Sequence, residues 1–141
     1  MGLPLSHVLT ELLAQHQALR EILTSCEQLA GELEAGRIEP SLLTRKVARL
    51  RVAFDSHNRY EDQFLRPVLG DIDAFGAVRL DHMVADHMEE HRLVRVGLAS
   101  SEIGELRLTL DRLRNHLTTE ERYFLSSKVL HDDLVTIESS G

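Results

Sequence analysis

The sequence HNRYE at residues 57–61 lies near the middle of a long segment with helical periodicity, and HLTTE at residues 116–120 repeats its pattern. On an α-helix a spacing of four residues brings two side chains onto one face, about 40° apart, so each pair offers an imidazole and a carboxylate together. Both pairs share their faces with apolar side chains: Leu50, Phe54, Phe64 and Val68 around the first, and Leu106, Leu113 and Phe124 around the second. Because an unpaired carboxylate is costly to bury, the two pairs predict a bound metal in a helical core.

Apolar residues recur with helical spacing in four segments, which we expect to form helices over about residues 6–35, 40–69, 75–100 and 101–130. Gly36 and Pro40 should stop the first helix and start the second, while Pro67 and the sequence GDID at residues 70–73 should end the second. Short connections require neighbouring helices to run antiparallel. The sequence therefore predicts an all-α fold, a single up-down-up-down antiparallel four-helix bundle spanning residues 1–141, with no β-sheet.

The composition is ordinary for a soluble globular protein, with 43% hydrophobic and 28% charged residues. A net charge of −7 argues against nucleic-acid binding, because it leaves no basic stripe for phosphates. The single cysteine, Cys26, cannot form an internal disulfide and is expected to be a buried apolar filler. The first residues lack the basic start of a signal peptide, and no apolar run reaches the roughly 18 residues that a membrane span needs. We therefore expect a cytoplasmic protein, whose oligomeric state the sequence leaves open.

Counting residues from the connections predicts which side chains lie at one height, because each helical residue rises about 1.5 Å. His16 and Glu61 are about equally far from the first connection. His57 and His87 are about equally far from the second, and His87 and His116 from the third. One layer should then receive metal ligands from all four helices: His16, His57, Glu61, His87, His91, His116 and Glu120.

Three further histidines are not expected in this layer, since His7 and His82 point to other helix faces and His131 is near the C-terminal end. A lone buried histidine is commonly structural, and a single His/Glu pair is a weak signal. The full set is stronger, because without a metal its imidazoles and carboxylates would lack partners. Neither a zinc-type pattern nor the Glu-x-x-His spacing of ferritin-like sites occurs. Two octahedral ions with bridging carboxylates and a bridging oxide or hydroxide would leave one open position.

The order and spacing of these residues resemble the hemerythrin-like, or HHE cation-binding, domain. The resemblance covers nearly the whole chain, in HQALREIL from residue 16, HNRYEDQFLRPVL from residue 57, EHRLVRVGL from residue 90 and HLTTEERYFL from residue 116. It implies a non-heme diiron centre, two iron ions with a bridging oxo or hydroxo group, in a four-helix bundle. In oxygen-carrying relatives the second acid stands five residues after its histidine, which corresponds to Glu121, whereas the HHE pattern uses Glu120. Regular helix geometry favours Glu120.

Relatives with such a centre bind or sense dioxygen, handle nitric oxide or peroxide, or store and donate iron. The resemblance leads us to expect reversible binding of dioxygen or a related diatomic for storage, delivery or sensing, with dioxygen, nitric oxide or peroxide as the small ligand. The alternatives are a diiron enzyme, such as a peroxidase, an oxidase or a nitric-oxide-handling enzyme, and iron storage or donation for repair of iron centres. Tyr123 lies along the ligand stripe, which predicts either a core aromatic or a phenol near the metal.

Overall fold

The computed structural model describes residues 4–68, 76–100, 102–123, 125 and 130. Within these ranges it describes the backbone but not the side chains of residues 76–80, 83, 86, 87, 91 and 95. This part of the chain folds into four long helices without a β-strand: α1 (Leu5–Glu34), α2 (Pro40–Tyr60), α4 (Gly76–Leu98) and α5 (Ile103–Tyr123). A short π-helix, η1 (Glu61–Leu65), continues α2. The predicted all-α fold with four helices is confirmed for these residues.

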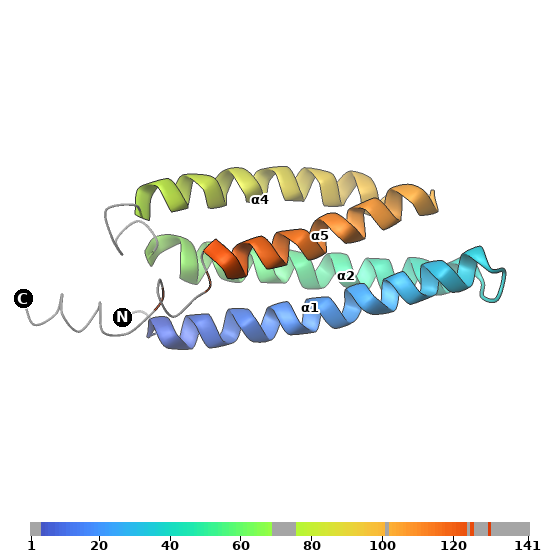
Figure 1. The fold of residues 1–141 in the computed structure, drawn as a ribbon, viewed down its shortest axis with the longest axis horizontal. Helices are drawn as coiled ribbons and strands as arrows, with labels where there is room; N and C mark the ends of the chain where they lie inside the picture. Colours follow the sequence, from blue (N-terminus) through green and yellow to red (C-terminus); the bar gives the residue numbers. More distant parts are fainter. Residues whose placement is uncertain (1–3, 69–75, 101, 124, 126–129, 131–141) are drawn as a thin grey trace, which may run out of the picture.

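The four helices lie side by side along one long axis (Figure 1). α1 contacts α2 and α5, and α4 contacts the same two helices, so each helix has two neighbours around a shared core. The connection between α1 and α2 lies at one end of the bundle, where the end of α4 also comes close to the start of α5 (Figure 1). No helix in the described residues is both long and apolar enough to cross a lipid bilayer.

The end of α1 is set by Gly36, which has a positive φ of 71°. The N–H of Gly36 donates to the carbonyl of Leu33 at 3.0 Å, and the N–H of Arg37 donates to that of Glu32 at 2.9 Å. These two bonds form a Schellman motif, which satisfies carbonyls of the last turn. Pro40 then begins α2, where the missing N–H is tolerated because N–H groups of the first turn have no helical partner.

The second predicted helix, expected to be regular over residues 40–69, changes pitch at Glu61. There the backbone widens into η1, which is closed by a hydrogen bond from the N–H of Arg66 to the carbonyl of Glu61 five residues earlier. Pro67 follows directly, and the wider turn relieves the clash between its ring and the carbonyl four residues before it. Helix continues through residue 68. The proline therefore follows a widened turn and does not end the helix at once.

α5 ends at Tyr123, whereas the sequence predicted a helix to residue 130. The N–H of Leu125 donates to the carbonyl of Glu120 at 2.9 Å, and neither Leu125 nor Leu130 is helical. Turns with this five-residue closure are common where helices end. Both leucines are buried and belong to the same apolar cluster, so these two positions after the helix still contribute to the core.

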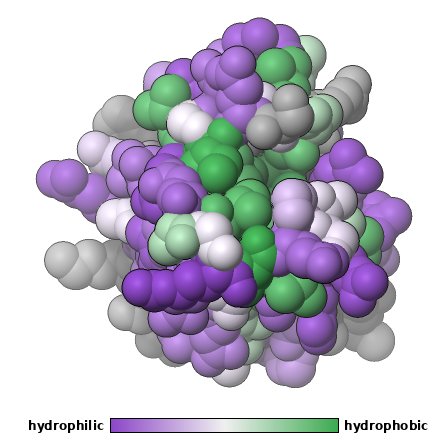
Figure 2. All heavy atoms as spheres, turned by 90° about the vertical axis from the view of Figure 1, so that its right-hand side faces the viewer, coloured by the Kyte–Doolittle hydropathy of each residue, from purple (hydrophilic) through white to green (hydrophobic). Residues whose placement is uncertain are grey.

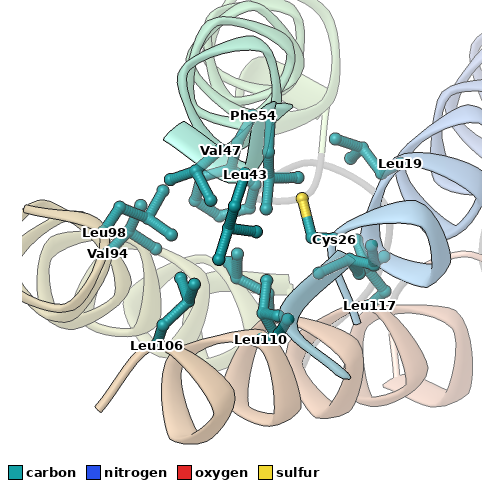
Figure 3. Close-up of a cluster of buried hydrophobic side chains, with 14 residues drawn as sticks. Leu19, Cys26, Leu43, Val47, Phe54, Val94, Leu98, Leu106, Leu110 and Leu117 are labelled. Atoms are coloured by element: carbon teal, nitrogen blue, oxygen red, sulfur yellow. The ribbon is translucent and has the colours of Figure 1, made fainter. Parts of the chain in front are cut away.

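Two apolar clusters fill the bundle. The larger runs from the α1–α2 connection to Phe54 and Leu117 and includes Cys26 (Figure 3). The smaller lies at the other end and comprises Leu5, Val8, Leu12, Leu65, Leu125 and Leu130. Along α1, along α2 with η1, and along α5, buried histidines and acids fall between the residues of the two clusters. The fold therefore encloses a polar layer between two apolar ones.

The end of the bundle at the α1–α2 connection carries an apolar band between polar side chains (Figure 2). A hollow of about 450 Å³ opens there, and its apolar lining includes Leu43, Val47, Leu98, Ile103 and Leu106. The larger apolar cluster lies between this hollow and the polar layer. The hollow is thus separate from the predicted metal ligands.

Cys26 is expected to be inert toward thiol reagents in the folded protein. Its side chain is fully buried, and burial raises the pKa of the thiol to about 11. Only about one thiol in a thousand is then ionised at pH 8, and the thiolate is the reactive form. An aromatic disulfide reagent, followed by absorbance, should react slowly with the native protein and rapidly after denaturation. Rapid labelling of the native protein would contradict this packing.

Candidate metal centre

The polar layer contains three histidines and two glutamates whose side chains are almost fully buried. The residue exposures do not exceed 7%, for His16, His57, Glu61, His116 and Glu120. These residues come from α1, α2, η1 and α5, and apolar clusters pack on both sides of them. Charged groups in such surroundings require neutralising partners.

Glu120 lies at the centre of the layer. Its Oε1 is 2.6 Å from Nε2 of His116, 3.7 Å from Nε2 of His57 and 4.0 Å from Nε2 of His16. The second acid, Glu61, places its Oε1 2.9 Å from Nε2 of His57. The same ring nitrogen of each histidine therefore faces the two carboxylates.

Two sets of three donor atoms are close enough to hold an ion each. One set is His16, His57 and Glu120, the other is Glu61, His116 and Glu120, and within each set the atoms lie within 4.8 Å of one another. Ligand bonds of about 2.0–2.2 Å would place opposite ligands up to roughly 4.4 Å apart, so only small adjustments are needed. Glu120 belongs to both sets, and a carboxylate that serves two ions is a bridge.

Several of these buried atoms make no hydrogen bond of normal geometry among the described residues. They are Nε2 of His16, Nε2 of His57 and both carboxylate oxygens of Glu120. Native proteins rarely leave buried polar atoms without a well-formed hydrogen bond, and a bound ion is a common explanation where they do. Imidazole nitrogens and carboxylate oxygens together form a ligand set that suits iron and other transition metals. The donor set therefore fits a metal centre.

The pKa values of the buried histidines and glutamates show how the charges of the layer are balanced in the absence of a metal ion. Burial lowers the pKa of His57, but the carboxylates of Glu120 and Glu61 outweigh it and raise that pKa to about 9. Burial likewise opposes the charge on His116, whose pKa is nevertheless raised by Glu120. Burial would raise the pKa of Glu120, yet contacts with Glu61, His116 and His57 hold it well below its usual range. Protons on the imidazoles thus neutralise the acids, and a cation would replace them.

His16 is anchored from outside the layer by Glu121. Nδ1 of His16 donates to Oε2 of Glu121 at 2.8 Å, and Nη1 of Arg20 lies 2.5 Å from the same oxygen. Burial lowers the pKa of His16, which favours the neutral ring. Since a carboxylate only accepts, the His16 proton is on Nδ1, and the Nε2 lone pair faces Glu120. The neighbouring acids therefore differ in position, with Glu120 inside the layer and Glu121, whose side chain is 30% exposed, behind a histidine.

Both acids of the layer stand at the start of a widened turn. The carbonyl of Glu61 accepts from the N–H of Arg66, and that of Glu120 accepts from the N–H of Leu125, each five residues on. The turn at Glu61 is a π-helix inside a longer helix, a feature that is rare and concentrates at functional sites. The turn at Glu120 closes the end of α5, where such closures are common. Neither turn can be predicted from the sequence, because no residue preference marks them apart from Pro67.

The remaining predicted ligands belong to α4. His87 and His91 are helical in the backbone, but their side chains lie outside the described residues, so their place in the layer stays a prediction. His7 and His82 are exposed, as expected, and His131 lies outside the described residues.

Both interpretations of Tyr123 are wrong, because its side chain is 55% exposed and rests against the guanidinium of Arg122, 5.5 Å from the ring centre. α5 ends at this residue, and Leu125 and Leu130 are the buried members of the smaller cluster that follow it. Tyr60 is partly buried and packs against the smaller cluster, with its ring centre 4.6 Å from that of Phe64.

Comparison with known families identifies one model that covers both the helices and the polar layer. The hemerythrin HHE cation-binding domain matches residues 7–127. No curated protein and no solved structure matches the chain. The match spans all five described residues of the layer.

Proposed function

Because the chain belongs to the hemerythrin HHE cation-binding domain family, we propose that it is a non-heme diiron protein that binds dioxygen or a related diatomic reversibly, for storage, delivery or sensing. The cofactor is two iron ions with a bridging oxo or hydroxo group. The observation that supports this proposal most strongly is the buried Glu120, which both candidate ion sets share. When bound, the iron pair would supply the electrons and the coordination position that a diatomic ligand needs.

The two ions would be held by different numbers of histidines. His16 and His57 would hold one ion, and His116 would hold the other together with His87 and His91 from α4. Glu120, which belongs to both candidate sets, would bridge them. We infer Glu61, whose carboxylate lies 2.9 Å from His57, as the second bridging acid. With fewer histidines, the ion at His16 and His57 would keep the open position. Dioxygen, nitric oxide or peroxide would be the ligand there.

We also infer that the helices form one domain with up-down-up-down topology. The course of the chain in Figure 1, where α2 returns beside α1 and α5 returns beside α4, supports this arrangement. Such a bundle brings ligands from every helix to one height. The apolar side chains of Leu12, Phe54 and Leu65, each 2% exposed or less, would exclude water from that layer. Exclusion of water favours reversible binding of dioxygen, because it slows the release of dioxygen in a reduced, charged form.

Optical spectroscopy of the iron-loaded protein tests the proposed function. The reduced protein, prepared without oxygen and mixed with dioxygen in a stopped-flow instrument, should develop a visible absorption band. Removal of dioxygen should abolish the band, and renewed addition should restore it over several cycles. A band that decays within one cycle while peroxide or nitric oxide is consumed would support the enzyme alternative instead. Binding of many more than two irons per chain would support iron storage.

Metal loading is expected to stabilise the fold. An ion that binds only the folded state adds about 2.7 kcal/mol to the free energy of unfolding when its free concentration is 100 times its Kd. We expect the melting temperature, measured by circular dichroism, to rise on loading with ferrous iron under anaerobic conditions and to fall again on chelation. An unchanged melting temperature in the presence of bound iron would mean that the unfolded chain binds iron equally well, which would contradict a site formed by the fold.

A further inference from the structure

Gln15 connects the imidazole of His57 to a carboxylate on α1. Oε1 of Gln15 lies 2.8 Å from Nδ1 of His57, and Nε2 of Gln15 donates to Oε1 of Glu11 at 3.0 Å. A carboxylate only accepts hydrogen bonds, so Glu11 requires the amide nitrogen of Gln15 to face it. The amide oxygen then faces His57. Because that oxygen also only accepts, the proton of the bond must reside on Nδ1 of His57.

We propose that Gln15 is a positioning residue, which fixes the tautomer and the ring orientation of His57 for metal binding; this inference rests on the proposed function. A neutral imidazole that carries its proton on Nδ1 presents a lone pair on Nε2. In this structure Nε2 is the atom that faces Glu61, at 2.9 Å, and Glu120, at 3.7 Å. The bond to Gln15 thus selects the nitrogen that points into the layer.

The hydrogen bond to Gln15 determines which ring nitrogen of His57 points into the layer, because the contacts with other rings do not. The ring packs at a steep angle on that of His16, with centroids 4.9 Å apart, and lies 6.4 Å from the ring of Phe54. These ring contacts restrict the plane of the imidazole but do not distinguish its two nitrogens. The bond from Nδ1 of His57 to Gln15, which comes from outside the layer, does distinguish them. α1 therefore provides one candidate ligand, His16, and orients a second through the residue before it.

Zinc serves as a redox-inert probe of this role. Gln15→Leu removes the acceptor and keeps a side chain of similar length, and loss of such a partner typically lowers metal affinity by 10–100-fold. Gln17→Leu is the matched control, because Gln17 makes the same kind of contact with the glutamate four residues on, Glu21, at the exposed surface. Competition with a chromogenic chelator should show weaker zinc binding for Gln15→Leu and no change for Gln17→Leu.

A reversed pair separates positioning from simple packing. In the double variant Glu11→Gln/Gln15→Glu, residue 15 still accepts from His57 and residue 11 can donate to it, so zinc affinity should remain within about threefold of the unmodified protein. Long-range ¹H–¹⁵N NMR of the zinc-loaded protein should show His57 protonated on Nδ1. Circular dichroism of the metal-free variants checks that each one is folded.

The outcomes distinguish this inference from the proposed function. If the unmodified protein binds no metal, the proposed function fails. If it binds metal but Gln15→Leu has the affinity of Gln17→Leu, or His57 carries its proton on Nε2, the role of Gln15 is overturned and the metal centre stands. Loss of affinity in Gln15→Leu with retention in the reversed pair supports the inference.

Discussion

Glu120→Gln is expected to lose most of its bound iron, falling from about two ions per chain to fewer than one. The carboxylate is 2% exposed, and its oxygen lies within 4.0 Å of three histidine nitrogens. An amide has one acceptor oxygen and no charge, so it cannot bridge two cations as a carboxylate does. Iron content per chain, measured by mass spectrometry after loading and desalting, gives the result directly.

Glu121→Gln is the control, since it makes the same chemical change one residue away. Glu121 bonds to the far side of His16 and to Arg20. Its loss should weaken binding without removing a ligand, and at saturating iron both ions should be retained. Both variants should keep the helical circular dichroism of the unmodified protein. If Glu121→Gln lost the iron and Glu120→Gln kept it, the bridging role would belong to the other acid.

Gly97→Ala is expected to destabilise the bundle by about 3 kcal/mol, at the upper end of overpacking effects. A methyl group at Gly97 would lie 1.7 Å from Oγ1 of Thr109 and 2.8 Å from its Cβ. Thr109 is buried and its hydroxyl donates to the carbonyl of Glu105 at 2.9 Å, so a rotation away from the methyl group would break this hydrogen bond. α4 and α5 would have to separate. The melting temperature should fall by roughly 10 °C.

Two variants show whether this contact is the cause. Gly104→Ala adds the same methyl group in α5 where no atom lies within 4 Å, and it should be neutral or slightly stabilising, by up to about 1 kcal/mol. Thr109→Ala in the Gly97→Ala background removes the nearest atom and should recover part of the lost stability. A Gly97→Ala protein that melts like the unmodified one would contradict the close approach of the two helices.

Much of the fold could be predicted because its signals are local. Gly36 is followed by Pro40, and these two residues produce the Schellman motif and the helix start that the structure contains. The wide turns at Glu61 and Glu120 had no comparable signal. They depend on hydrogen bonds over five residues, which differ from the usual four by a small change in backbone angle. Sequence periodicity therefore predicted a fourth helix that was too long.

The layer of the candidate site could be predicted because helical rise is uniform, so counting from a connection gives the height of a side chain. That reasoning brought His16, His57 and Glu120 together, and the structure places them within a few ångströms. It could not find Gln15 or Arg20, which act through their side-chain ends. Whether a glutamine reaches a histidine on another helix depends on its rotamer and on its partner, which periodicity does not specify.

We propose that two iron ions lie inside the bundle at the carboxylate of Glu120. X-ray diffraction from iron-loaded crystals at the iron absorption edge tests this most directly, because anomalous peaks locate the metal independently of the protein atoms. We expect two strong peaks between the helices, one beside Nε2 of His16 and His57 and the other beside Nε2 of His116, with Glu120 in contact with both. A single peak, or peaks only at the protein surface, would contradict the account.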